Sequence, residues 1–144
     1  MTRGGDGALD AQRAVSRETS TPEMARSIFG DRTPIAEAYV DRLAGAGIER
    51  GLIGPREGSR LWERHVLNCA VVADLIELEA RVADVGSGAG LPGIALAIAR
   101  PDLDMVLIEP LLRRSDFLRE TIELLALDRV SLLRSRAEDV HAEA

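Results

Sequence analysis

Residues 82–93 constrain this chain most, because they are predicted to form a strand, a glycine-rich turn and the start of a helix. Val82 and Val85 are β-branched residues that suit a buried strand. The alternating glycines that follow can adopt positive φ angles and let a ligand approach the backbone closely. Pro92 suits the first position of the helix, where its missing N–H costs nothing. The stretch therefore predicts a nucleotide-binding corner in an α/β protein.

The segments after this corner repeat the alternation of strand and helix. Strands are predicted at residues 105–108 and 130–133, and an amphipathic helix is predicted between them over residues 111–127. Together with a helix over residues 91–99, residues 79–144 are expected to form strand, helix, strand, helix and strand. This order is that of the first half of a doubly wound parallel sheet, so we expect the Rossmann-like α/β class.

A cap of helices is expected over residues 21–78, before the sheet begins. In the first clear helix of this cap, Thr33 is expected as the N-cap and Pro34 as the first helical residue. Gly45 and Gly47 are expected to end that helix, because glycine punctuates helical patterns.

A further helix is predicted over residues 59–77, after a glycine-rich loop. Trp62 is expected to pack in the core of a chain with only 3% aromatic residues. A short helix is also predicted at residues 23–29, whereas residues 1–20 lack apolar periodicity and are expected to be a disordered tail. The stripe that the longer helix should turn towards the core consists of Leu61, His65, Asn68, Val72 and Leu75.

Composition narrows the class of protein further. The chain has 144 residues, of which 46% are hydrophobic, enough for one domain with an aliphatic core. Its net charge of −6 does not indicate nucleic-acid binding, although a local cluster of arginines would leave that class open. Cys69 is the only cysteine, which excludes an intrachain disulfide and suits a reducing compartment. The sequence has no metal-ligand spacing, apolar run of membrane length or signal-peptide core, so we expect a cytoplasmic protein without a metal.

Glu109 stands at the end of the second predicted strand, 19 residues after Gly90. A carboxylate there can accept hydrogen bonds from both hydroxyls of a ribose, so the glycine turn and this acid fit one adenosine-type ligand. Two classes of cofactor compete for such a site. Residues 88–93 match the dinucleotide fingerprint G-x-G-x-x-G, which together with Glu109 would suit NAD and an oxidoreductase.

The acid that precedes the glycines favours the other class of cofactor. Asp84 is followed by Gly86, Gly88 and Gly90, a pattern typical of enzymes that use S-adenosylmethionine. The Asp84 carboxylate can hold the methionine amino end of that cofactor, whereas it would repel a pyrophosphate. S-adenosylmethionine is therefore the preferred ligand, NAD is the alternative, and a turn without any ligand is the third interpretation.

Three segments carry a resemblance to a known family. Residues 84–94 are the most specific, because Leu-Pro-Gly stands directly after the glycines. Residues 64–67 read Arg-His-Val-Leu on the helix before the sheet, and residues 136–138 read Arg-Ala-Glu after the third strand. Together they resemble the ribosomal RNA small subunit methyltransferase G family over about residues 25–139. That family usually continues its Arg-His-Ile-Leu segment with Asp and Ser, where this chain has Asn and Cys.

The resemblance implies a cytoplasmic enzyme that methylates N7 of a guanine in 16S ribosomal RNA, free or in the small ribosomal subunit. Guanine N7 carries a lone pair and no proton, so no general base is needed and no catalytic side chain is expected. The main task of the protein is then to hold the guanine and the methyl donor in line. Arg64 and His65 are the candidates for substrate contact. By the same resemblance, the cofactor would contact Gly86, Leu91, Ala137 and Glu138, with Glu109 at its ribose.

The fourth strand of that family and its later loops are absent from these 144 residues. The first strand would then have an open edge beside Val82 and Val85, so we expect the chain alone to be unstable, self-associating or weakly active. A truncated, non-catalytic fragment of the methyltransferase is therefore an alternative to the active enzyme, beside the NAD-binding oxidoreductase. The roles of Arg113 and Arg114, at the start of the helix after Glu109, stay open.

Overall fold

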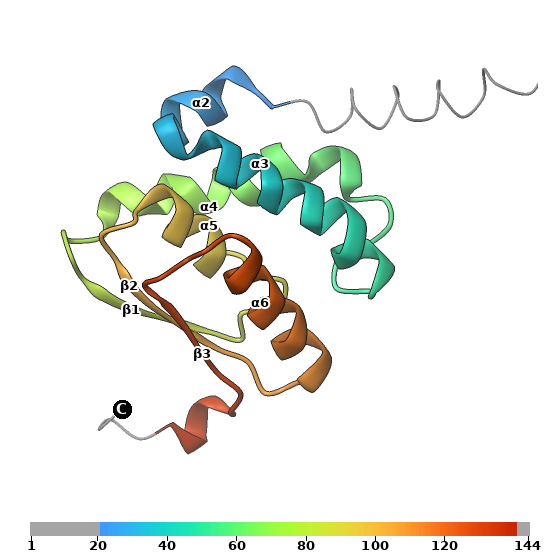
Figure 1. Ribbon diagram of the computed structural model, residues 1–144, viewed down its shortest axis with the longest axis vertical. Coiled ribbons are helices and arrows are strands. Elements are labelled where there is room, and N and C mark those ends of the chain that lie inside the picture. Colours follow the sequence, from blue (N-terminus) through green and yellow to red (C-terminus); the bar gives the residue numbers. More distant parts are fainter. Residues whose placement is uncertain (1–20, 141–144) are drawn as a thin grey trace, which may run out of the picture.

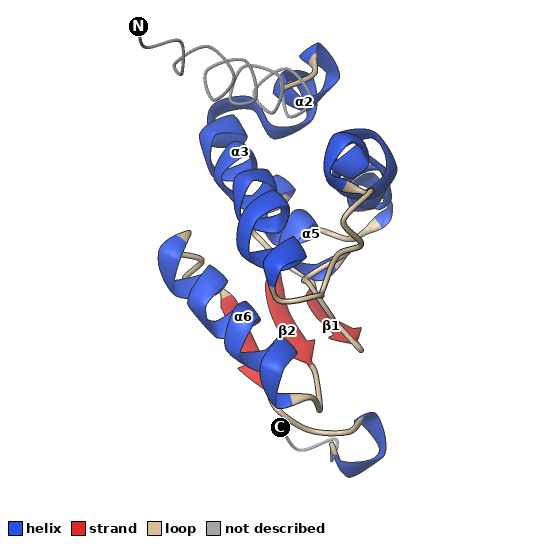
Figure 2. Cartoon of the chain, turned by 90° about the vertical axis from the view of Figure 1, so that its right-hand side faces the viewer, coloured by secondary structure: helices blue, strands red, loops and turns tan. Residues whose placement is uncertain are grey.

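Three parallel strands in the order β1-β2-β3 form the sheet of the computed structural model, which describes residues 21–140 (Figure 1). The strands are β1, Arg81–Val85, β2, Asp104–Ile108, and β3, Val130–Leu133, within one residue of the predicted positions. In Figure 2 the arrowheads of β1 and β2 mark the carboxyl ends of the strands, where the glycine-rich turn leaves the sheet. The expected disordered tail at residues 1–20 lies outside the described residues.

Helices α5, Gly93–Ala99, and α6, Leu112–Leu124, connect the strands. Parallel neighbours require such crossovers, and right-handed crossovers between strands in consecutive order place both helices on one face of the sheet. Met105 and Leu107 of β2 point to this face and are fully buried. The described chain therefore has the expected βαβαβ arrangement, the first half of a doubly wound sheet.

The strand β1 is less buried than β2, and among the described strands it pairs with β2 alone. Val85 is 59% exposed, although its residue type suggested a buried strand. It lies in register with Ile108, on the face that turns away from α5 and α6, and at the free edge of the described sheet. The prediction of a buried position is therefore wrong for Val85, and the open edge predicted beside Val82 and Val85 is present.

The start of α5 also differs from the prediction. Pro92 is the N-cap, joined to Leu91 by a cis peptide bond, and Gly93 is the first helical residue. The Gly93 N–H donates a hydrogen bond of 3.0 Å to Asp84 Oδ2, which a proline in that position could not do. A Cβ at position 93 would collide with Leu107 and come within 2.6 Å of Asp84 Oδ2, so the helix backbone packs directly against the sheet.

The helical region before the sheet begins with α2, Glu23–Phe29, at the predicted residues, and continues with α3, Thr33–Arg42. Thr33 is not the N-cap, because a 3₁₀ turn precedes the helix and Arg32 takes that position. The Thr33 hydroxyl instead donates to the Gly30 carbonyl at 2.6 Å. The threonine thus stabilises the turn that leads into α3.

Gly45 and Gly47 do not end this helix, because the chain continues through a π-helical turn, Leu43–Gly47. Neither glycine has a positive φ angle, and a Cβ at Gly47 would come within 3.4 Å of Ile53 Cγ1. Gly51, with a φ of 73°, adopts the left-handed conformation that commonly follows a helix. The predicted end is therefore too early, because glycine composition alone does not show which residue turns left-handed.

The segment predicted as one helix over residues 59–77 is a succession of short helical pieces. Asn68, Val72 and Leu75 are exposed, so the predicted core stripe is wrong for these residues. A π-helical turn holds more residues than an α-helical one, which displaces the period of 3.6. Trp62 is buried, as predicted. The pieces are a 3₁₀ turn, Gly58–Arg60, a π turn, Leu61–Val66, the helix α4, Leu67–Val71, and a 3₁₀ turn, Val72–Leu75.

Two arginines connect the helical region to the sheet and its helices. The Arg42 guanidinium lies 4.6 Å from the centroid of the Phe117 ring and donates a hydrogen bond of 2.6 Å to the Thr121 hydroxyl on α6. Arg100, at the end of α5, donates to the Ala73 carbonyl at 2.6 Å. These contacts fix the helices before the sheet against both crossover helices.

Candidate functional site

The glycine-rich turn after β1 follows a left-handed backbone path. Gly86, Gly88 and Gly90 have φ angles of 75°, 57° and 95°, as the alternating glycines predict. A Cβ at Gly86 or Gly88 would meet no atom within 4 Å, whereas a Cβ at Gly90 would collide with Ile94 and lie 3.0 Å from the Tyr39 hydroxyl. The first two glycines therefore leave open space beside the backbone, and the third is required for packing.

Hydrogen bonds anchor this turn to the end of the sheet. The N–H groups of Gly86 and Ser87 both donate to the Ile108 carbonyl, at 2.8 and 3.2 Å. The Ser87 hydroxyl donates to the Asp84 carbonyl at 2.9 Å. The turn thus has a fixed shape at the carboxyl end of the strands, the end at which open α/β sheets bind their ligands.

Asp84 is half-buried between this turn and α5. Its Oδ2 atom accepts the Gly93 N–H, so one carboxylate oxygen holds the first turn of the helix. Burial raises the pKa of the Tyr39 hydroxyl, and the nearby Cys69 and Asp84 raise it further. Burial also raises the pKa of the Cys69 thiol, with a smaller contribution from the Asp84 charge. The three side chains lie close enough to influence one another electrostatically, and the acidic protons of Tyr39 and Cys69 are both held more tightly than usual.

A cavity of about 350 Å³ opens where the three strands end. Gly86, Ala137 and Glu138, three of the residues predicted to contact the cofactor, line this cavity together. The 3₁₀ turn Ala137–Asp139 brings the last two residues from the end of β3 to the end of β1. The other lining residues, which sequence reasoning did not propose as contacts, are Val85, Ile108, Pro110, Ser135 and Arg136.

One signal in the sequence could have found these additional residues. Val85 and Ile108 are the last residues of their strands, and Pro110, Ser135 and Arg136 follow within three residues of a strand end. The carboxyl ends of parallel strands lie at the same edge of the sheet, so every residue just after a predicted strand is a candidate for ligand contact.

Glu109 is buried, with only 2% of its surface exposed, and it does not line the cavity. Its N–H donates to the Leu133 carbonyl at 3.0 Å, which fixes the backbone at the end of β3. Its Oε1 atom lies 3.5 Å from Nη1 of Arg114. The structure thus gives Arg114 a partner. Ile108 and Pro110, the neighbours of Glu109 in the chain, line the cavity, whereas Glu109 itself lies behind them.

Arg64 and His65, the predicted substrate contacts, lie in the π-helical turn before α4 and do not line the cavity. The Arg64 side chain is exposed. His65 Nε2 lies 3.1 Å from Glu57 Oε2, and this hydrogen bond lowers the pKa of the Glu57 carboxyl. The structure therefore places these two residues in the helical region, apart from the residues that surround the cavity.

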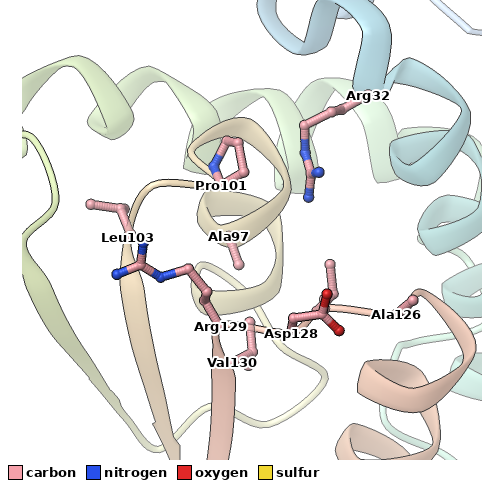
Figure 3. Close-up of a pocket in the computed structure, with 9 residues that line it drawn as sticks. Arg32, Ala97, Pro101, Leu103, Ala126, Asp128, Arg129 and Val130 are labelled. Carbon is pink, nitrogen blue, oxygen red and sulfur yellow. The ribbon is translucent and has the colours of Figure 1, made fainter.

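A second cavity, of about 210 Å³, lies at the amino ends of β2 and β3 (Figure 3). Arg32 lines it and donates from Nε to the Ile98 carbonyl near the end of α5, at 2.7 Å. Asp128 and Arg129 line it from the loop before β3, and none of the predicted site residues does. Within residues 21–140, no three His, Cys, Asp or Glu side chains are grouped to hold a metal ion, and no helix has the length and apolarity to span a membrane.

The fold and the site together define a class of protein. A helical region followed by a parallel βαβαβ unit, with a glycine turn after β1 and a buried acid after β2, forms the first half of a Rossmann-like methyltransferase fold. Comparison with known families narrows this class. Residues 32–144 match the family described as rRNA small subunit methyltransferase G, and the chain belongs to that family.

Curated relatives carry the same description. The chain is 61% identical over 131 residues to the Ribosomal RNA small subunit methyltransferase G of Nocardioides sp., covering 90% of the chain and 52% of that relative. It is 66% identical over 115 residues to the protein of that name from Renibacterium salmoninarum, covering 79% of the chain and 54% of the relative. It is 62% identical over 118 residues to the protein of that name from Mycolicibacterium gilvum, covering 82% of the chain and 52% of the relative. The chain spans about half the length of these relatives.

Proposed function

We propose that this chain binds S-adenosylmethionine at the carboxyl end of its sheet and serves the methylation of guanine N7 in 16S ribosomal RNA, in the cytoplasm. The observation that carries the proposal is the cavity in which Gly86 meets Ala137 and Glu138, in a chain of this methyltransferase family. The names of the relatives state that they act on small-subunit ribosomal RNA, which supports this class of substrate. In this proposal residues 21–78 are a helical cap and residues 79–144 are the cofactor-binding half.

The shape and chemistry of the turn fit an adenosine-type cofactor. The open space beside Gly86 and Gly88 lets a ligand approach the backbone, and the adjoining cavity of about 350 Å³ falls in the range of small-molecule sites. Glu109 supplies a buried carboxylate at the strand end where a ribose would be recognised. The proposed cofactor-binding residues are Asp84, Gly86, Gly88, Gly90, Leu91, Glu109, Ala137 and Glu138.

S-adenosylmethionine supplies an electrophilic methyl group when it is bound. Guanine N7 has a lone pair and no proton, so no side chain of this chain has to act as a general base. Its residues act by holding the reactants, and the Glu138 carboxylate, which lines the cavity, would favour the positive charge that methylation places on the guanine ring. We further propose that Arg64 and His65 contact the RNA, since Arg64 is exposed and His65 is half-buried in the helical region.

Thermal unfolding of the purified 144-residue chain tests the cofactor class. S-adenosylhomocysteine should raise the unfolding temperature with increasing concentration, by a stabilisation of about 2.7 kcal/mol at a hundred times its Kd. NADH, measured in parallel, should have no effect. A shift with NADH alone would support the oxidoreductase, and a folded chain that responds to neither ligand would support a non-catalytic fragment.

Methyl transfer tests the substrate class. The chain is incubated with labelled S-adenosylmethionine and either 16S RNA or small ribosomal subunits, and the labelled base is identified after digestion. We expect 7-methylguanine, and RNA already methylated at that guanine is the control that should accept no label. Label on any other atom would contradict the proposal.

A further inference from the structure

Tyr39 reaches from α3 to the glycine turn and is fully buried, although it does not line the cavity. Its hydroxyl donates a hydrogen bond of 2.8 Å to the carbonyl of Ala89, the residue between Gly88 and Gly90. The same hydroxyl would lie 3.0 Å from a Cβ at Gly90. The tyrosine thus touches the turn at the point where the backbone has most conformational freedom.

The helix that follows cannot supply this hydrogen bond. In a regular helix the N–H of Gly93 would donate to the carbonyl four residues earlier, which is that of Ala89. Here the Gly93 N–H donates to Asp84 Oδ2, and the first helical bond of this kind runs from the Ile94 N–H to the Gly90 carbonyl at 2.7 Å. Among residues 21–140, the Tyr39 hydroxyl is therefore the group that satisfies the buried Ala89 carbonyl.

The hydroxyl is well suited to remain a donor. Burial raises the pKa of Tyr39, with further contributions from Cys69 and Asp84, so the phenol holds its proton more firmly than an exposed tyrosine. A permanent donor fixes the orientation of the peptide between Ala89 and Gly90. The N–H of the same peptide donates to the Ser87 carbonyl at 2.8 Å, so both sides of the peptide are held. Loss of the phenol would leave only the bond to Ser87, beside the conformational freedom of Gly90.

We propose that Tyr39 is a positioning residue for the cofactor, which holds the glycine turn in the conformation that binds S-adenosylmethionine by donating to the Ala89 carbonyl. The inference rests on the proposed function, because it assigns the turn to that ligand. It also gives the helical cap a part in cofactor affinity, since Tyr39 lies on α3, which belongs to the cap and not to the βαβαβ unit.

The variant Tyr39→Phe tests this role, because it removes one oxygen and keeps the ring. We expect the Kd for S-adenosylhomocysteine, measured by titration calorimetry, to rise about three- to tenfold. Thr33→Val is the matched control: it also removes a buried hydroxyl that donates to a backbone carbonyl, that of Gly30, away from the turn. The Kd of Thr33→Val for S-adenosylhomocysteine should equal that of the unsubstituted chain, even if its unfolding temperature falls as far as that of Tyr39→Phe.

Amide hydrogen exchange of the ligand-free variants gives a second readout. In Tyr39→Phe, the Gly90 amide, which donates to the Ser87 carbonyl at 2.8 Å, should exchange about tenfold faster, while the amides of β2 keep their rates. Unchanged exchange and unchanged affinity would overturn the proposal, as would equal losses of affinity in both variants. If the unsubstituted chain binds no S-adenosylhomocysteine, the proposed function fails and the assignment to the cofactor fails with it. In that case, faster exchange in Tyr39→Phe would show that the hydrogen bond from Tyr39 to Ala89 only stabilises the fold.

Discussion

The two ends of the sheet carry cavities that are built differently. At the carboxyl end, Gly86 leaves open space beside the backbone, and Ala137 and Glu138 of the turn after β3 complete the wall. At the amino end, the side chains of Arg32, Asp128 and Arg129 surround the cavity (Figure 3), and Arg32 satisfies a carbonyl near the end of α5. Under the proposed function, the carboxyl end receives the ligand and the amino end completes the fold. Substitutions at the carboxyl end should therefore change ligand affinity, whereas substitutions at the amino end should change stability alone.

The largest effect is expected from Gly90→Ala at the carboxyl end. Its Cβ would collide with Ile94 at a φ angle of 95°, which should lower the free energy of unfolding by about 3 kcal/mol and abolish S-adenosylhomocysteine binding. Gly88→Ala is the control, because its φ is also positive, at 57°, but its Cβ meets no atom within 4 Å. It should cost about 1 kcal/mol. Urea unfolding of both variants checks the difference, and equal losses would contradict it.

An intermediate effect is expected from Glu109→Gln, at the same end of the sheet. If the carboxylate accepts ribose hydroxyls, the Kd for S-adenosylhomocysteine should rise about ten- to a hundredfold, as for the loss of hydrogen bonds to a charged group. Glu123→Gln, on the exposed side of α6, should leave the Kd unchanged. Calorimetric titration measures both constants. An unaltered Kd in Glu109→Gln would show that the acid serves only its contact with Arg114.

The smallest effect is expected from Arg32→Ala, at the amino end. It removes the donor to the Ile98 carbonyl, so the free energy of unfolding should fall by about 1 kcal/mol while the Kd for S-adenosylhomocysteine stays within twofold. Arg129→Ala removes an exposed arginine from the same cavity and should change stability by less than about 0.5 kcal/mol. Denaturant unfolding combined with ligand titration separates the two quantities. Weaker ligand binding in Arg32→Ala would remove the distinction between the two ends.

Local features of this fold are predictable from the sequence. The bounds of β3 and α2 agree with the prediction at every residue, because apolar period and flanking turn residues determine them. The positive φ angles of Gly86, Gly88 and Gly90 follow from the alternation of glycines in the turn. Such features depend on residues that are neighbours in the chain.

Features that depend on distant residues are not predictable in this way. The π turn at Leu61–Val66 displaces the helical period, so Asn68 and Val72 are exposed where a core stripe was expected. The contact of Tyr39 with Ala89 joins residues 50 positions apart, and helical spacing shows only that the tyrosine is buried. The assignments of Arg64 and His65 to the substrate, and the expected instability of the chain alone, stay predictions.

The packing of Gly93 against Leu107 and Asp84 changes how the glycine pattern should be interpreted. The last glycine of G-x-G-x-x-G is fixed here by the closeness of a helix to a strand, before any ligand is considered. Its presence therefore carries information about a distance inside the fold and very little about which nucleotide is bound. We expect discrimination between cofactors to depend on residues outside the glycine pattern, such as Asp84 and Glu138. Their carboxylates would repel a pyrophosphate and attract a sulfonium.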